Sequence, residues 1–263
     1  MTQATKPSEK IKSIMKAPSV EQQFKNVLGD NAEPFVGSII DLYNGDQYLQ
    51  ECEPKQVVME AMKAATLKLP VNKGLGFAYI VPYKGKNGFN ATMQIGYKGY
   101  IQLAMRTGQY RIINADHVYE GELKHLNKLT GEINFGGEKK SDKVVGYFAH
   151  IEMMNGFSKT LYMTKEDIDK HAKRFSKSYS YAGSPWKTDF DAMAKKTVIR
   201  NLLSHYGYLS VEMINAADAD IQRDVKDDVE QDTAKKTLDV DDVVYEDYED
   251  VPEEAEEQEK PDF

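Results

Sequence analysis

The chain has 263 residues, of which 41% are hydrophobic and 29% charged, and its formal net charge is −8 at pH 7. It contains one cysteine, Cys52, which excludes an intrachain disulfide, and no apolar stretch approaches the roughly 18 residues that span a bilayer. These properties exclude a disulfide scaffold and a membrane-spanning protein. They predict a soluble intracellular protein with room for one domain of roughly 200 residues.

The charge is unevenly distributed along the chain. Residues 1–210 hold 29 Lys/Arg and 21 Asp/Glu, a net charge of +8, whereas residues 211–263 hold 5 Lys/Arg and 21 Asp/Glu, a net charge of −16. A basic body attracts polyanions, of which nucleic acid is the commonest large example. We expect residues 211–263 to be an acidic, disordered tail, because they are rich in charge and poor in core-forming residues. The tail either aids solubility, docks on a basic partner or folds back over the basic body.

The first part of the chain is expected to be helical. Residues 1–18 are polar and contain two prolines, so we interpret them as a flexible N-terminal arm. Ser19 followed three positions later by Gln22 matches a capping box, and apolar residues then recur at helical spacing. Three helices are therefore predicted, from Ser19 through Leu28, from about Pro34 to Tyr43, and from about Pro54 to Leu69.

A β-hairpin is predicted next. Two β-type runs, Phe77–Tyr83 and Phe89–Ile95, flank a turn with an Asn-Gly signal. Lys84 and Lys86 lie at the tip of this hairpin, where they are candidate DNA contacts.

The remaining elements complete an α+β pattern. Further strands are expected at Tyr110–Tyr119, near Ile133–Phe135, at Val144–Met153 and at Phe157–Met163, and they make an antiparallel sheet. Two more helices are expected, one capped by Thr164 and running to about Arg174, and one running from Trp186 to Tyr206 with Gly207 as its stop.

The segment MQIGYKGYIQLAMRTG carries the first candidate site. If its helix starts near Lys98, then Lys98, Gln102 and Arg106 share one face at spacings of four residues. Tyr97 and Tyr100 flank this cationic ridge and could stack on nucleic-acid bases. The alternative is that the tyrosines belong to the core and the cations form a solvated face.

A second cationic and aromatic segment lies between the last two predicted helices and continues into the final one. Its composition is suited to binding an extended single strand of nucleic acid, although its aromatic side chains could instead pack into the core. In the final helix, an apolar stripe leaves the remaining cations on the opposite side. The candidate residues are Lys173, Arg174, Phe175, Lys177, Tyr179, Tyr181, Trp186, Lys187, Lys196 and Arg200.

Motifs for covalent chemistry are lacking. No phosphate-binding G-x-x-x-x-G-K-[ST] loop is present, so an ATP-driven motor is not expected. Asp116-His117 with Glu120 and Glu122 could in principle contribute to a nuclease metal site, a less favoured alternative. No cofactor is expected to be required, and the sequence does not indicate a need for magnesium. The histidines show no metal-binding spacing and are each interpreted as surface or hydrogen-bonded core residues: His117, His125, His150, His171 and His205.

Two blocks of sequence are more specific than either cationic segment alone. GYKGYIQLAMRTG, at residues 96–108, and SPWKTDFDAMAKKTVIRNL, at residues 184–202, resemble the most distinctive blocks of the RecT family of phage-type single-strand annealing proteins. The resemblance extends from about Ala61 to Tyr206. It implies a bent antiparallel sheet backed by helices, with DNA in a cationic groove. Between the N-terminal arm and the acidic tail, we expect one core domain over residues 19–210.

The resemblance also implies a function and partners. It implies a non-enzymatic recombinase that binds single-stranded DNA, assembles into rings or helical filaments, and pairs complementary strands through an annealed duplex intermediate without hydrolysing ATP. A phage exonuclease and a host single-strand binding protein are implied as further partners, in the cytoplasm of a bacterial host. Lys98, Arg106, Lys187, Lys196 and Arg200 fall inside the matching blocks as phosphate contacts, while Tyr97, Tyr100 and Trp186 would shape the groove.

Composition alone leaves two other binding functions open. A passive protector of single-stranded DNA would use the same lysines and aromatics but would shield the bases. A protein-interaction scaffold with incidental basic patches would not bind single strands even at low salt.

Overall fold

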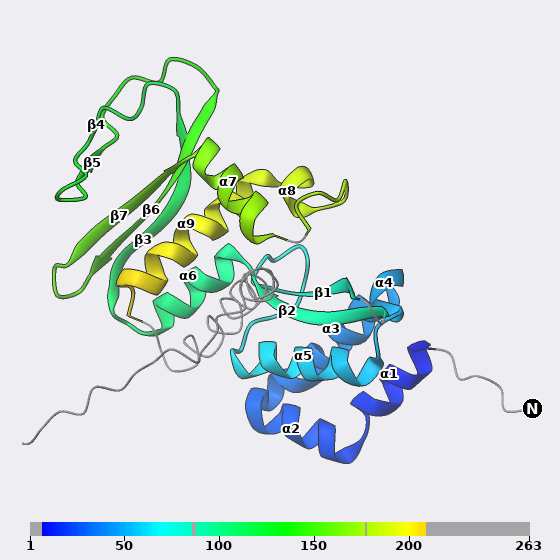
Figure 1. Cartoon of the computed structure of the whole chain (residues 1–263). Coiled ribbons are helices and arrows are strands. Elements are labelled where there is room, and N and C mark those ends of the chain that lie inside the picture. The colour runs from blue at the N-terminus through cyan, green and yellow to red at the C-terminus, as the bar shows by residue number, and fades with distance from the viewer. Residues whose placement is uncertain (1–6, 86–87, 177, 209–263) are drawn as a thin grey trace, which may run out of the picture. The chain divides into compact units, whose positions relative to one another are not determined.

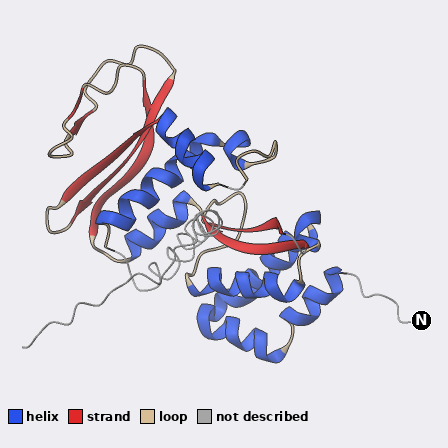
Figure 2. Ribbon diagram, viewed as in Figure 1, coloured by secondary structure: helices blue, strands red, loops and turns tan. Residues whose placement is uncertain are grey.

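A computed structural model describes residues 7–85, 88–176 and 178–208 (Figures 1 and 2). The first third of this part is helical, with a short 3-10 turn, η1, between the second and third helices. The bounds are α1 Pro7–Met15, α2 Pro18–Leu28, η1 Gly29–Asn31, α3 Ala32–Asn44, α4 Gln47–Gln50 and α5 Pro54–Thr66.

The expected N-terminal arm differs from the structure. Ile11 and Met15 lie one helical turn apart on α1, and both are buried in the core with α2, α3 and α5 packed around that helix. Residues 7–15 are therefore a structural part of the fold, and of the expected arm only residues 1–6 lie outside the described residues. The capping-box prediction at Ser19 is also wrong, because α2 starts at Pro18, with Ala17 at the cap position and no side-chain cap.

The predicted hairpin is present as β1 (Ala78–Gly85) and β2 (Gly88–Ile95), whose register pairs Gly85 with Gly88 at the turn. Helix α5 packs against it. The Gln56 side chain accepts a hydrogen bond from the Ala91 N–H, and the Glu60 carboxylate accepts one from the Met93 N–H. Side chains of α5 therefore satisfy backbone donors on the outer edge of β2.

Helix α6 (Tyr97–Arg106) leads from the hairpin into a separate three-stranded antiparallel sheet, in the order β3-β6-β7. Its strands are β3 Tyr110–Tyr119, β6 Val144–Met153 and β7 Ser158–Thr164. The connection from β3 to β6 carries the short pair β4 (His125–Leu126) and β5 (Ile133–Asn134). The described strands thus divide among three antiparallel sheets.

Of the helices that follow β7, the first and the last pack against the three-stranded sheet (Figure 1). α7 (Lys165–Phe175) begins at Thr164, whose hydroxyl accepts the Asp167 N–H at 3.0 Å, which confirms the predicted cap. The single helix expected from Trp186 is divided into α8 (Pro185–Thr188) and α9 (Phe190–Tyr206). The division falls at Asp189, whose backbone is not helical and whose carboxylate caps α9 by accepting the Ala192 N–H.

The architecture is therefore α+β with antiparallel sheets, as predicted, and buried residues from the N-terminal helices, the hairpin and the three-stranded sheet form one hydrophobic core. Gly207 ends α9 as expected, its N–H bonding to the Leu203 carbonyl. Within the described ranges, no helix is both long and apolar enough to cross a membrane. The acidic tail predicted for residues 211–263 lies outside the described residues.

Candidate nucleic-acid interface

Two glycines determine where α6 and its cations lie. A Cβ on Gly96 would stand 2.2 Å from the Gly76 carbonyl oxygen, and one on Gly99 would stand 2.2 Å from the Phe77 carbonyl oxygen. The start of α6 therefore lies directly against the chain that enters β1. Lys98, between the two glycines, is exposed, and its aliphatic stem passes beside Gly76.

The first turn of α6 also lies near the start of α9. Burial raises the pKa of the Tyr79 phenol, and the nearby Asp189 carboxylate and Tyr97 phenol raise it further. Tyr79 in the hairpin, Tyr97 on α6 and Asp189 at the α8–α9 junction are thus electrostatic neighbours. The two sequence blocks that carry the family resemblance meet at this point of the fold.

Other residues of the predicted α6 ridge are buried or make contacts within the fold. Tyr100 is only 3% exposed and belongs to the core, which is the alternative left open for it by the sequence. Arg106 donates hydrogen bonds to the carbonyl oxygens of Leu67 at 2.7 Å and Lys68 at 2.9 Å, and so braces the end of α6 to the end of α5. Tyr97 and Gln102 are partly buried.

The cations of the second segment converge around one tyrosine ring. The Nζ atoms of Lys187 and Lys173 lie 4.3 Å and 5.8 Å from the centroid of the Tyr179 ring. The Tyr179 hydroxyl donates to the Asp169 carboxylate, which also pairs with Lys173 at 2.6 Å. The Lys173 ammonium and the Tyr179 hydroxyl together lower the pKa of Asp169. The ring thereby brings cations of α7 and α8 to one place.

The other aromatics of this segment differ in exposure. Trp186 is only 5% exposed and packs edge-on against Phe190, so its indole belongs to the core rather than to a surface on which bases stack. Tyr181 is 65% exposed, and Phe175 is partly buried beneath the Arg174 guanidinium, which lies 4.9 Å from its ring centroid.

Helix α9 contributes two more cations, one of which lies near α7. Arg200 lies near His171 on α7, because its charge, with that of Arg174, contributes to the low pKa of that imidazole. Lys196 precedes Arg200 by one helical turn and therefore shares its face of α9. We call the following five residues the α7–α9 cationic cluster: Lys173, Arg174, Lys187, Lys196 and Arg200.

The remaining predicted residues are outside this cluster. Lys84 is exposed near the turn end of β1, in the hairpin. Lys86 and Lys177 lie outside the described residues, so their side chains have no described position. His171, which lies near Arg174 and Arg200, was not among the residues predicted to contact DNA. The pattern of an amphipathic helix does not show which residues of another helix will lie beside its histidine.

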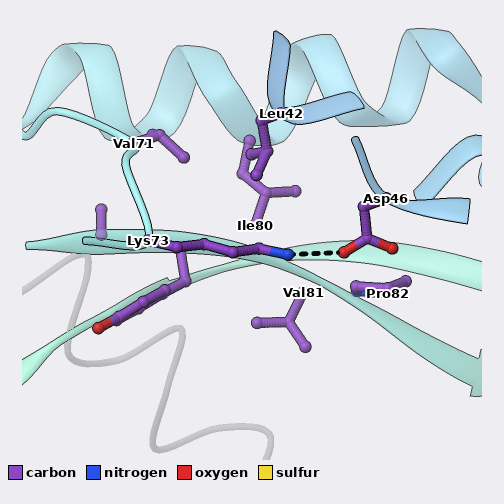
Figure 3. A pocket seen from close by; sticks show the side chains of 9 residues that line it. Leu42, Asp46, Val71, Lys73, Ile80, Val81 and Pro82 are labelled. Atoms are coloured by element: carbon purple, nitrogen blue, oxygen red, sulfur yellow. Dashed lines mark hydrogen bonds and ion pairs between the residues drawn. The ribbon is translucent and has the colours of Figure 1, made fainter. Parts of the chain in front are cut away.

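A small pocket lies elsewhere, between the hairpin and the N-terminal helices. Figure 3 shows Lys73 reaching across it to Asp46, with an Nζ to Oδ2 distance of 2.9 Å, between Ile80 on one side and Val81 and Pro82 on the other. Its volume of about 120 Å³ is below the range of typical ligand sites, about 300–1,000 Å³. None of the cluster residues lines it.

The carboxylates considered for a nuclease site have partners within the fold. Asp116 Oδ1 pairs with Lys195 Nζ at 2.8 Å, Glu120 accepts the Ser141 hydroxyl, and Glu122 accepts the Tyr119 N–H. Burial opposes ionisation of Asp116, but the Lys195 ammonium and the His117 N–H outweigh it and lower the pKa. In the part of the chain that is described, no three His, Cys, Asp or Glu residues are grouped to hold a metal ion.

Comparison with known proteins places these features in a family. A sequence profile of the RecT family matches residues 33–236. YqaK of Bacillus subtilis strain 168, an uncharacterised protein, is 48% identical over 231 residues, which cover 88% of this chain and 75% of YqaK. RecT of Escherichia coli strain K12 is 30% identical over 227 residues, which cover 82% of each chain.

These matches define a class of DNA-binding recombination protein. The chain belongs to the RecT family, which confirms the resemblance drawn from its two sequence blocks. Family membership supports DNA binding and single-strand annealing in recombination as the general function of the chain.

Proposed function

We propose that this protein is an ATP-independent annealing protein that binds single-stranded DNA at the α7–α9 cationic cluster, oligomerises along the strand and pairs it with a complementary strand. The observation that carries the proposal is the convergence of cations from α7, α8 and α9 on Tyr179 and His171. The proposal takes these two groups of cations, which come from three segments of the chain, as one DNA-binding surface.

The arrangement suits a task that requires no covalent step. Annealing must offset the repulsion between two polyanions while the base edges stay available for pairing. Side chains that contact phosphates can do this without reading sequence, since phosphate contacts position a strand and base contacts specify it. Exposed Tyr181 adds an aromatic face on which a base of any identity can stack.

The direct test mixes two complementary oligonucleotides that carry a donor and an acceptor dye, in the absence of nucleotide. The protein should accelerate duplex formation, and a Lys187→Ala/Arg200→Ala variant should be slower. A matched variant, Lys10→Ala/Lys55→Ala, removes two exposed lysines from α1 and α5 and should anneal like the unmodified chain. Equal rates for all three proteins would contradict the placement of the site.

Passive protection of single strands is the second candidate, because it would use the same cations. The same assay separates the two functions, since a protector slows duplex formation whereas an annealing protein accelerates it. Protein that fails to bind single strands even at low salt would contradict both, and would favour an interaction scaffold.

Assembly and partners extend the proposal. We expect rings or helical filaments on DNA, a phage exonuclease that supplies the single strand, and contact with a host single-strand binding protein, all in the bacterial cytoplasm. No cofactor is required for this mechanism. Electron microscopy after sequential addition of the two strands would give the assembly state.

A further inference from the structure

His171 on α7 is a half-buried histidine with an incomplete set of contacts. Its ring packs against Phe175, with the ring centroids 4.7 Å apart. Its Nδ1 atom is buried and has no hydrogen-bond partner among the described residues. A buried polar atom without a partner is costly, so His171 is neither the surface residue nor the hydrogen-bonded core residue that the sequence predicted.

The surroundings of His171 are positively charged. Burial is the main cause that lowers its pKa, and the guanidinium groups of Arg200 on α9 and Arg174 on α7 lower it further, to about 4. Strands β6 and β7 also pack against α7, but no group on them contributes to the shift. On α7 itself, the Asp169 carboxylate is engaged by Lys173 and Tyr179, and the Asp167 carboxylate accepts the Thr164 hydroxyl. At neutral pH the imidazole is therefore neutral between two cations.

An anion bound among His171, Arg174 and Arg200 would change which protonation state of the imidazole is favoured. It would pair with both guanidinium groups and would favour the protonated ring, which also becomes a donor at both nitrogens. A phosphodiester fits this chemistry, because the planar guanidinium donates two parallel hydrogen bonds to phosphate oxygens. The neighbouring lysines of the cluster would contact adjacent phosphates of the same strand.

We propose that Arg174, Arg200 and His171 form a phosphate subsite for the DNA strand, in which His171 takes up a proton as the phosphodiester binds. This inference rests on the proposed binding of single-stranded DNA and adds that the pH regulates that binding. Because the proton is bound more tightly in the complex than in the free protein, DNA affinity rises as the pH falls.

The size of the effect follows from linkage. If the bound phosphate returns the His171 pKa to its ordinary value of 6.5, affinity at about pH 5.5 exceeds that at about pH 8 by about tenfold. The test measures dissociation constants for a rhodamine-labelled oligothymidylate over this range, because neither thymine nor that dye titrates there. His171→Gln removes the titrating ring, and His125→Gln, on exposed β4, is the matched control.

We expect the DNA affinity of the unmodified chain and of His125→Gln to rise about tenfold from about pH 8 to about pH 5.5. The affinity of His171→Gln should not change with pH over the same range. An NMR titration of the unmodified chain adds a readout that does not depend on a variant. The His171 ring signals should titrate at higher pH with oligothymidylate, or with sodium sulfate at matched ionic strength, than with chloride alone.

Two outcomes would overturn the inference while the proposed function stands. The first is that His171→Gln binds DNA strongly and keeps the full pH dependence of the unmodified chain. The second is that neither oligothymidylate nor sulfate shifts the pH at which the His171 ring titrates. Failure of the unmodified chain to bind oligothymidylate at any pH would overturn the proposed function and this subsite together.

Discussion

The Lys187 ammonium lies over the face of Tyr179, 4.3 Å from the ring centroid. The Tyr179 hydroxyl donates to Asp169, which fixes the ring from its other end. A cation held on an aromatic face gains about 0.5–1 kcal/mol at an exposed site while its ammonium can still donate outward. In the proposed site, this contact would hold Lys187 in place for a phosphate before DNA binds.

Replacing Lys187 by alanine should weaken binding to single-stranded DNA without discriminating between sequences. Loss of one phosphate contact should make the plot of log affinity against log salt shallower by about 0.7. Fluorescence anisotropy at several KCl concentrations measures this slope. Lys55→Ala, an exposed lysine on α5, should leave the slope unchanged, and an unchanged slope for Lys187→Ala would place Lys187 outside the interface.

Arg106→Ala should affect stability more than DNA binding. The guanidinium group donates to two carbonyl oxygens that follow α5, so its loss should lower the free energy of unfolding by about 1–3 kcal/mol. Urea denaturation followed by circular dichroism measures the change. The salt slope of DNA binding should stay at the value of the unmodified chain, and a shallower slope with normal stability would support the phosphate role that the family resemblance implied.

Gly99→Ala should destabilise the fold, because the new Cβ would approach the Phe77 carbonyl oxygen to 2.2 Å. Overpacking of this kind costs about 1–3 kcal/mol. Gly37→Ala is the control, since no atom lies within 4 Å of a Cβ built at that position inside α3. Alanine there should stabilise the helix by about 0.5–1 kcal/mol, so thermal unfolding should shift in opposite directions for the two variants.

Asp46 should stabilise the fold in a pH-dependent way. Burial opposes its ionisation, but the hydrogen bond from Lys73, helped by backbone N–H groups, lowers its pKa below 3.8. A lowered folded-state pKa contributes stability above the unfolded-state value, which is lost as the pH falls through the folded-state pKa.

Asp46→Asn keeps an acceptor for the cap of α4 but removes the charge that pairs with Lys73. It should cost about 0.5–1 kcal/mol at neutral pH and almost nothing at about pH 2. Asp46→Ala also removes the cap, at a further cost of about 1 kcal/mol. Denaturation at both pH values checks this, and an Asp46→Asn cost that did not change with pH would contradict the role of the charge.

Trp186 is the single tryptophan of the chain, so fluorescence excited at wavelengths that tyrosine does not absorb reports on it alone. Because the indole is 5% exposed, acrylamide should quench it weakly in the free protein, compared with N-acetyltryptophanamide. Saturating oligothymidylate should change the quenching little, since a buried ring gains no shielding from a base. Strong protection on DNA binding would instead indicate that a base stacks on Trp186.

Local patterns predicted much of the fold. The bounds of β3 and β6, the turn of the first hairpin and the Thr164 cap depend on alternation, turn residues and capping, which are written in a few consecutive residues. Helix α1 was missed because its polar composition hides an apolar pair, Ile11 and Met15, whose burial depends on helices that come later in the chain.

The sequence predicted which types of residue make up the candidate site, but not which of them lie close together in the fold. Periodicity placed Lys196 and Arg200 on one face of a helix, yet it could not say that Arg200 would lie near His171. Likewise Tyr100 and Tyr181 were both predicted to contact DNA, but Tyr100 is buried and Tyr181 is exposed. Burial of an aromatic residue depends on its tertiary neighbours, which spacing along the chain does not reveal.

The side chains of Gln56 and Glu60, which bond to backbone donors of β2, also limit how copies of this protein can join. An unprotected edge would accept a strand from another molecule and extend the hairpin into an intermolecular sheet. Here α5 already occupies the Ala91 and Met93 donors. A polymer of this protein must therefore be built through side-chain surfaces or other strand edges, and β2 cannot provide its repeating contact unless α5 is displaced.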